Sequence, residues 1–476
     1  MHGALPVRLV SIACCIGWSA TLLVAPATAA ADEPGVALAA PVASSTASPG
    51  VPFAGVWTDG PRPTEAAALD DLNAGWGRVT VIWSTVEPQP GTFDWTALDP
   101  SMAIAAGDGR RAVLALVRNN PTWAAASRCS VSSDAERQHL ADFMAVLAGR
   151  YKGVVWQLYN EEDNTSPTAD AQSNLGGCFG TLGPDGAPTP AGPRQYARTL
   201  EAASAAVRGV DPTAQLASGG VTSAGYTDQG GAFDRGFLAA VLAQLKQDDA
   251  LASLDVVAVH YFSSQAFLYA DRGTDLLGRL AQLKQDALNA GLTPDEVKPV
   301  IIDELSFTDS LGTSTSDAAS AFNVAQQAYV PKALARATAA GVRAALWFWL
   351  QDASGGLGSD NAYGLKDRTG APKPSYQALR TFISQITRTD QLVGRLDLTA
   401  VSPALEGYAF VRTDGRALQL VWANVPIGDP STYSYVPDCQ VAEVRDAAGN
   451  LAAFDAAANR VTLSGQPRYV VCAPSG

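Results

Sequence analysis

Two glutamates each close a short apolar segment of this chain. Glu161 ends the segment 154–161, VVWQLYNE, and Glu304 ends the segment 298–304, KPVIIDE. Continuous Val, Ile and Leu runs are typical of strands in a parallel sheet that helices cover on both faces. A carboxylate at the carboxyl end of such a strand lies where barrel enzymes do chemistry. One such glutamate is as often an ion-pair or helix-capping residue, so the pair carries the prediction of a two-carboxylate active site.

The elements that must position these glutamates repeat along the chain. The expected strands are 53–58, 78–83, 112–117, 154–161, 215–220, 255–261, 299–304 and 344–350. Amphipathic helices are expected between them, among others at 136–151, 195–207, 233–247, 274–289, 318–340 and 375–387. Strand followed by helix, eight times, predicts an α/β fold, the (β/α)8 TIM barrel. A doubly wound open sheet is the alternative, but no glycine-rich phosphate loop follows the first strand.

The hydrophobic pattern of the sequence changes after Arg388. Short alternating segments such as 407–411 and 417–422 are separated by turn signals at 413–415 and 448–450. This pattern predicts a small C-terminal antiparallel β-sandwich. We therefore expect a catalytic barrel over residues 51–388 and a β-sandwich domain over residues 389–476.

The first 50 residues differ from both domains. Arg8 precedes an apolar run from Leu9 to Val24, and small residues follow at 27–31, which predicts a signal peptide over residues 1–30. Residues 31–50 are rich in Ala, Val, Pro and Ser and predict a flexible spacer. No later uncharged run is long enough to span a bilayer. The expectation is a secreted, extracytoplasmic protein with no integral membrane segment after signal removal.

Composition excludes several classes of partner. The net charge is -13 and no cluster of Lys or Arg stands out, so the electrostatic footprint of a nucleic-acid-binding protein is missing. An acidic exterior suits a neutral or cationic ligand better than a polyanion. No C-x2-C spacing occurs, and His139 and His260 are the histidines beyond the signal peptide, which argues against a zinc site. We expect no metal and no cofactor.

Four cysteines remain once Cys14 and Cys15 leave with the signal peptide. An even number in an exported chain predicts two disulfides. Sequence order favours one in each domain, and the expected pairs are Cys129 with Cys178 and Cys439 with Cys472.

Asn160 directly precedes Glu161, and Ile301-Ile302-Asp303 precedes Glu304. In these segments the chain resembles the retaining glycoside hydrolases of clan GH-A, whose (β/α)8 barrels carry catalytic glutamates at the ends of strands 4 and 7. The resemblance implies that Glu161 is the acid/base, that Asn160 binds the 2-hydroxyl of the sugar, and that Glu304 is the nucleophile. Glu162 is a departure, because many members have proline there.

Other segments agree with this resemblance. Arg78 begins a segment similar to the second strand, whose arginine supports the nucleophile, and 87–95, EPQPGTFDW, is similar to the stretch that follows it. His260-Tyr261 resembles the strand-6 pair, in which the tyrosine contacts the nucleophile. The barrel followed by a β-sandwich is similar to the β-xylosidase and α-L-iduronidase family more than to a bare-barrel endoglucanase.

Several residues could bind sugar or simply pack. Indole rings bury the apolar faces of sugars, and tryptophans fall on or just after strands at Trp57, Trp83, Trp123, Trp347 and Trp349. About half are expected to be core aromatics, and Trp349 is the favoured platform because it lies nearer the carboxyl end of its strand. Asn119 or Asn120 could donate to a hydroxyl or serve a turn. His260 could orient an active-site group or be a core residue.

The resemblance implies hydrolysis of O-glycosidic bonds with retention, in an oligosaccharide, polysaccharide or other glycoside. This chemistry needs one carboxylic acid and one carboxylate on opposite faces of the sugar. Glu161 must hold a proton while Glu304 stays ionised, and Arg78 and Tyr261 are expected to stabilise the charge on Glu304. Two alternatives stay open: a carbohydrate-binding surface protein without catalysis, and a transglycosylase that uses the same residues.

Overall fold

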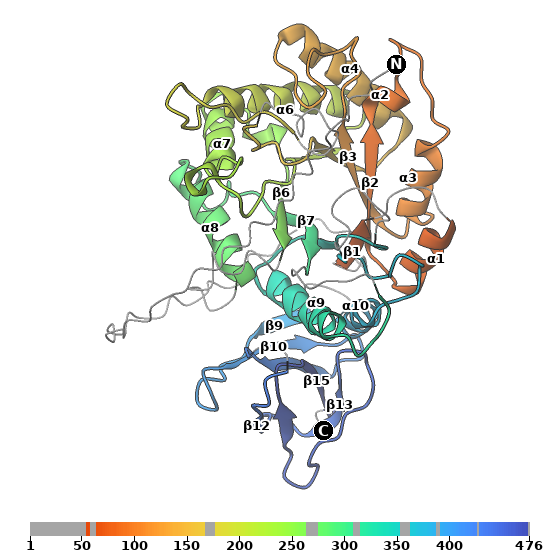
Figure 1. The fold of residues 1–476 in the computed structure, drawn as a ribbon, viewed down its shortest axis with the longest axis vertical. Helices are drawn as coiled ribbons and strands as arrows, with labels where there is room; N and C mark the ends of the chain where they lie inside the picture. Colours follow the sequence, from red (N-terminus) through yellow and green to blue (C-terminus); the bar gives the residue numbers. More distant parts are fainter. Residues whose placement is uncertain are drawn as a thin grey trace, which may run out of the picture.

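The computed structural model describes residues 54–57, 63–166, 177–262, 275–307, 315–352, 362–386, 391–425 and 428–474. A ring of helices surrounds a set of strands, and a smaller β-domain packs beneath helices α9 and α10 (Figure 1). The predicted signal peptide and spacer lie outside the described residues. No helix in the described ranges is long and apolar enough to cross a membrane.

The larger domain is a parallel eight-stranded barrel. Its strands are β1 (Ala54–Trp57), β2 (Trp76–Ile82), β3 (Ala112–Arg118), β4 (Val155–Leu158), β5 (Gln215–Ala217), β6 (Val257–Phe262), β7 (Val300–Ser306) and β8 (Ala344–Trp347). The order β5-β4-β3-β2-β1-β8-β7-β6 is continuous, and parallel bridges from Ala217 to Val256 and from Val221 to Val259 close the ring. The predicted fold class is confirmed.

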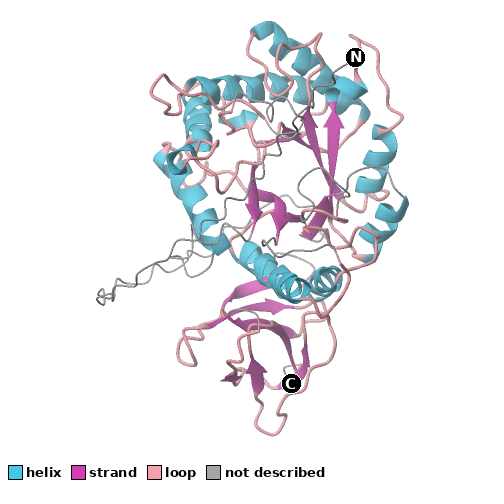
Figure 2. Cartoon of the chain, in the orientation of Figure 1, coloured by secondary structure: helices cyan, strands magenta, loops and turns pink. Residues whose placement is uncertain are grey.

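Helices cover the outside of the barrel (Figure 2). They are α1 (Pro63–Asp71), α2 (Trp83–Val86), α3 (Leu98–Ala106), α4 (Asp134–Arg150), α6 (Ala191–Val210), α7 (Phe237–Gln247), α8 (Asp275–Asn289), α9 (Ala321–Ala339) and α10 (Pro374–Gln385), with short turns η1 (Thr227–Gln229) and η2 (Leu251–Ser253). In α4, Ser133 and Glu136 form a capping box, and Leu140 and Leu147 bury its inner face. Such apolar stripes position each helix against the strands.

The interior of the barrel is layered. Its lower layer is apolar and consists of Trp76, Leu114, Val155, Ala217, Val256, Ile301, Ala344 and Leu346. Side chains two residues further along a strand point to the same side. Arg78, Gln157 and Asp303 therefore form the next layer above Trp76, Val155 and Ile301, nearer the carboxyl ends of the strands.

The smaller domain is antiparallel, as predicted. Its strands are β9 (Leu392–Arg395), β10 (Leu405–Val411), β11 (Ala417–Ala423), β12 (Tyr433–Tyr435), β13 (Val441–Arg445), β14 (Val461–Leu463) and β15 (Arg468–Cys472). They form a five-stranded sheet, β13-β15-β11-β10-β9, and a two-stranded sheet, β12-β14. The expected bond between Cys439 and Cys472 is present and joins the ends of this domain's last strands.

A buried ion pair joins the two domains. Arg336 on α9 donates from Nε and Nη2 to the two carboxylate oxygens of Glu406 on β10, at 3.0 and 2.8 Å. The Tyr408 hydroxyl and the Asn424 amide also donate to Glu406. These contacts hold the pKa of Glu406 below its usual value, although burial acts to raise it. A bidentate, fully bonded pair of this kind fixes the orientation of one domain on the other.

Candidate active site

A β-bulge on β7 turns two successive carboxylates toward the barrel interior. Val259 pairs with Ile302 and His260 pairs with Glu304, so Asp303 is an extra residue with no partner on β6. In a regular strand Asp303 and Glu304 would point to opposite sides. The bulge removes that alternation, and both side chains contact Arg78, at 2.9 Å for Asp303 and 2.7 Å for Glu304.

Arg78 contacts most of the polar side chains of this layer. Its guanidinium is fully buried and also donates to Gln157 Oε1 at 3.1 Å and to Asn160 Oδ1 at 3.2 Å. Gln157 in turn donates to Asp303 Oδ2 at 2.8 Å. Residues of β2, β4 and β7 are thereby joined through one cation. Arg78 fixes the positions of Asn160 and Glu304 together.

His260 lies between the two predicted catalytic glutamates. Its Nδ1 is 3.0 Å from Glu161 Oε1, and its Nε2 is 3.3 Å from Asp303 Oδ2 and 3.4 Å from Glu304 Oε1. Burial acts to lower the pKa of the imidazole, but Glu304 and Asp303 outweigh it and raise that pKa well above its usual value. When protonated, the ring directs Nδ1–H at Glu161 and Nε2–H at Asp303 and Glu304.

The end of β4 departs from the strand that the sequence predicts. The strand stops at Leu158, and Tyr159 and Glu161 both adopt left-handed backbone conformations, with φ of 63° and 49°. Such values are uncommon for residues with a Cβ and occur where surrounding structure holds them. The turn places the Glu161 side chain beside His260 with 27% of its surface exposed, compared with 7% for Glu304. Glu161 is the carboxylate that a ligand entering from solvent can reach.

Two more carboxylates follow Glu161 and are fully buried. Both oxygens of Glu162 lack a hydrogen-bond partner among the described residues, and burial raises the pKa of this carboxyl well above its usual value. Asp163 accepts from the backbone N–H and the hydroxyl of Thr222. Burial and the charge of Glu161 nevertheless raise the pKa of Asp163 to about 7. Glu162 and Asp163 thus hold their protons to higher pH than ordinary carboxyl groups do.

Two glycines after β5 make room for these side chains. A Cβ on Gly219 would lie 2.0 Å from Glu162 Oε2, and one on Gly220 would lie 2.0 Å from His260 Nε2 and 2.9 Å from Asp303 Oδ1. Any larger residue at Gly220 must displace the imidazole that joins the two glutamates. Neither glycine forms a recognisable motif in the sequence, and neither was predicted as part of the site.

The aromatic candidates separate into two groups. Trp349 packs with Phe262, Phe348 and Tyr363 just beyond the carboxyl ends of β6 and β8, and its ring centroid is 4.3 Å from that of Phe348. Trp347 instead belongs to the apolar layer between strands and helices and donates to Tyr363 O at 2.9 Å. This arrangement puts Trp349 rather than Trp347 at the barrel mouth.

Trp83 also packs between barrel and helices. It is fully buried, stacks on Phe143 of α4 at 5.1 Å and donates to Glu87 Oε2 at 2.8 Å. These contacts are those of a core residue. The side chain of Trp57 lies outside the described residues.

Tyr261 lies elsewhere than expected. It pairs in register with Leu305 and is fully buried in the apolar layer between strands and helices. Successive residues of a strand face opposite sides. The group that approaches Glu304 from β6 is therefore His260.

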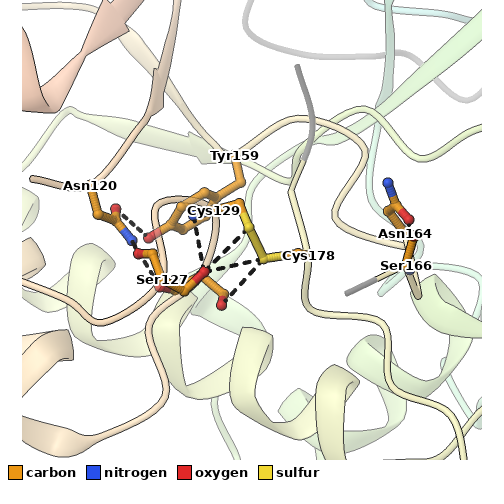
Figure 3. The surroundings of a disulfide bond; sticks show 8 residues. Asn120, Ser127, Cys129, Tyr159, Asn164, Ser166 and Cys178 are labelled. Atoms are coloured by element: carbon orange, nitrogen blue, oxygen red, sulfur yellow. Dashed lines mark hydrogen bonds between the residues drawn. A yellow bond between two sulfur atoms is a disulfide. The ribbon is translucent and has the colours of Figure 1, made fainter. Parts of the chain in front are cut away.

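In the loop after β3, the side chain of Asn120 makes more hydrogen bonds to its surroundings than that of Asn119. Asn120 accepts from the hydroxyl of Tyr159 at 3.0 Å and donates to Ser127 O at 2.9 Å (Figure 3). Asn119 is buried with φ of 62°, and its carbonyl accepts from Ser84 N. Asn120 therefore holds the loop against the end of β4, whereas Asn119 joins it to the start of α2.

The expected disulfide between Cys129 and Cys178 is present beside these contacts (Figure 3). It joins the loops after β3 and β4, and the two cysteines are 49 positions apart in the sequence. Ser127 Oγ lies 3.3 and 3.4 Å from its two sulfur atoms. The bond braces the segment that carries Asn160 and Glu161. Within the described ranges, no group of three His, Cys, Asp or Glu residues could hold a metal ion.

Solved structures with the same architecture are known. A family 39 glycoside hydrolase from Bacteroides cellulosilyticus WH2 aligns with a TM-score of 0.64 and 16% identity, covering 88% of this chain and 81% of its own. A glucosidase from Croceicoccus marinus aligns at 0.56 and 13% identity, covering 89% and 96%. The catalytic domain of GH30 xylanase C from Talaromyces cellulolyticus aligns at 0.55 and 14% identity, covering 89% and 97%.

These alignments bear on the fold. Identities this low show a shared fold and no more, and the fold is that of the glycoside hydrolases which the sequence resembles. No protein-family model matches the chain, and no curated protein matches it. The activity must therefore be argued from the side chains at the barrel mouth.

Proposed function

We propose that this protein is a secreted retaining O-glycoside hydrolase, with Glu161 as acid/base and Glu304 as nucleophile. The observation that carries the proposal is the bridge through His260, whose two nitrogens approach one glutamate from the end of β4 and one from β7. Glycosidic cleavage usually requires two carboxyl groups that flank the scissile bond, and here two such groups lie at the mouth of the barrel. The solved barrels that align with this chain include a xylanase and a glucosidase.

The environments of the two glutamates suit different roles. Burial raises the pKa of Glu304, whereas His260 and Arg78 act to lower it. These two cations stabilise the carboxylate that must attack the anomeric carbon. Glu161 is more exposed and has no arginine or lysine ion pair among the described contacts. It is placed to donate a proton to the departing oxygen and later to take one from water.

Other residues of the layer would orient the sugar. The Asn160 side chain, whose Oδ1 accepts from Arg78, lies beside the proposed nucleophile, where it would bind a hydroxyl next to the reacting carbon. Trp349 and its aromatic neighbours offer an apolar surface for a ring face. The expected sugar-binding roles of Trp57, Trp83, Asn119 and Tyr261 have weaker support. Trp83 and Tyr261 are buried in the layer between strands and helices, and Asn119 is buried with its carbonyl bonded to Ser84 N.

Secretion rests on two features. The N-terminal segment has the order of a signal peptide, and both predicted disulfides are formed. Disulfides persist mainly in oxidising compartments outside the cytosol. We therefore place the enzyme where oligosaccharides, polysaccharides or other glycosides are its substrates.

A panel of aryl glycosides tests the proposal. The wild type should release aryl alcohol from at least one member, and Glu304→Gln should lower kcat/KM by about 10⁴-fold or more, as for other catalytic nucleophiles. Glu161→Gln should lose about 10²- to 10⁴-fold, the usual contribution of a general acid. Glu296→Gln, a change in the turn between α8 and β7 at the opposite end of the barrel, is the matched control. Full activity in Glu304→Gln would refute the mechanism, and no hydrolysis of any member would favour a carbohydrate-binding protein.

A further inference from the structure

A cavity opens at the end of the barrel opposite the glutamates. It has a volume of about 680 Å³ and lies under the amino-terminal ends of β2, β3 and β4, where Trp76, Val113 and Val155 line it. The apolar layer of the barrel interior includes Trp76 and Val155 and separates this cavity from the polar layer of the mouth. A pocket of this size accommodates a small organic molecule.

The lining of the cavity is cationic. It includes four basic side chains, Arg111, Arg150, Lys152 and Arg343, and one acidic side chain, Asp99. The whole chain, in contrast, carries a net charge of -13. Two of these cations are compensated, because Arg150 donates to Asp99 at 2.8 Å and Arg111 donates to Asp70 at 2.6 Å. The remaining positive charge at this site comes from Arg343 and Lys152.

Arg343 is the buried cation of this set for which no ion pair with a carboxylate is found among the described residues. Its side chain is 9% exposed and its guanidinium lies 5.4 Å from the centre of the Trp76 ring. Nη2 donates to Gln215 Oε1 at 2.6 Å, but Nε has no hydrogen-bond partner among the described residues. Asp255 acts on Arg343 electrostatically, yet it already pairs with Arg208 at 2.8 Å. A buried guanidinium with an unused donor is costly unless an anion completes it.

We propose that this cavity is a binding site for a small oxyanion, a carboxylate or phosphate group, held by Arg343 with help from Lys152. The forked donors of a guanidinium match the geometry of both anions. Lys152 is an exposed point charge at the rim that would attract the ligand. The site is separate from the proposed catalytic glutamates and does not depend on their function.

Titration calorimetry and thermal unfolding test this site in the purified protein. The probes are inorganic phosphate and glucuronate, with sodium chloride at matched ionic strength as the reference. We expect saturable binding and a rise of about 2 °C or more in the unfolding midpoint at saturation. Binding of phosphate alone, glucuronate alone or both would identify the anion and support the site.

Variants locate the binding. Arg343→Gln should weaken binding at least tenfold, and Lys152→Ala, an exposed change that leaves the core intact, should weaken it severalfold. Arg416→Gln is the matched control, because Arg416 pairs with Asp414 in the β-domain and does not line the cavity. If Arg343→Gln does not fold, Lys152→Ala decides. Absence of saturable binding for both anions, or equal affinity in wild type and Lys152→Ala, would overturn the proposal.

Discussion

Two buried arginines in this molecule have opposite surroundings. Arg336, between the domains, meets one carboxylate, and Glu406 is fully bonded with a lowered pKa. Arg78, in the barrel, meets two carboxylates, Asp303 and Glu304, with a third, Glu161, on the other side of His260. At the domain interface the charges balance, whereas at the barrel mouth the carboxylates outnumber the cations.

The different surroundings indicate that Arg336 serves stability and that Arg78 serves the chemistry of the barrel mouth. A balanced, fully bonded pair has no reactive group left over, and its effect is to hold two domains in one orientation. The barrel mouth keeps carboxyl oxygens without partners among the described residues, on Asp303 and on Glu162. It also keeps a Glu304 whose pKa is raised by burial. An arrangement that lowers stability in this way is retained when the groups act on a ligand.

Of the two arginines, the one at the barrel mouth is expected to have the larger effect on activity when it is removed. Arg78→Gln should lower kcat by about 10³-fold, in the range found when one charge-stabilising donor is lost from an active site. Loss of this cation raises the pKa of Glu304 further, so the acidic limb of the pH–rate profile should move to higher pH. A profile at the wild-type position, with reduced kcat, would mean that Arg78 does not control this carboxylate.

The matching change at the interface should affect stability instead. Arg336→Gln leaves Glu406 buried without its cation and should lower the free energy of unfolding by about 3 kcal/mol. Urea denaturation measures this loss, and kcat/KM on the best aryl glycoside should stay within about twofold of wild type in the folded variant. If Arg336→Gln instead lowered kcat strongly without a loss of stability, the two arginines would not have the separate roles assigned to them.

A smaller effect, on the pH dependence of stability, is expected from substituting Glu162. The pKa of this carboxyl is raised in the folded protein, so the folded state binds a proton that the unfolded state releases above about pH 4.5. Stability linked to that proton is present at low pH and is lost as the pH rises toward the folded pKa. Glu162→Gln cannot ionise and should unfold about 3 °C or more above wild type at pH 8, with little difference at pH 4.

Glu296 provides a control of opposite sign for this experiment. It is partly exposed, and its hydrogen bonds with Lys246 and the backbone of Thr293 lower its pKa to about 2. Glu296→Gln should therefore be slightly less stable than wild type at pH 8. The same midpoint shift for Glu162→Gln at pH 4 and pH 8 would contradict the assignment of a raised pKa.

Much of the architecture could be predicted from the sequence. The repeated apolar strands and amphipathic helices indicated the barrel, alternating segments indicated the β-domain, and cysteine order indicated both disulfides. Each of these signals is local and periodic, so a single sequence is sufficient to read it. The neighbours of Glu304 were harder, because Tyr261 was expected beside it and the structure puts His260 there.

The remaining features of the site depend on breaks in that periodicity. The bulge at Asp303 turns an extra carboxylate inward, and left-handed backbone at Tyr159 and Glu161 ends β4 early. Strand patterning cannot reveal either break, because each is set by contacts between distant segments. The role of Gly220 has the same origin, since the ring that it accommodates comes from β6. Gln157 alone had a local signal, as a polar residue within a buried strand.

Trapping the glycosyl-enzyme tests the central claim most directly. An activated aryl glycoside from the panel, with its 2-hydroxyl replaced by fluorine to slow the second step, is incubated with wild type and with Glu304→Gln. Peptide mass spectrometry should then find one sugar bound to Glu304 in the wild type and none in the variant, as a covalent retaining mechanism requires. A sugar on another carboxylate, or hydrolysis with no adduct and inverted anomeric product, would contradict the assignment of Glu304 as the nucleophile.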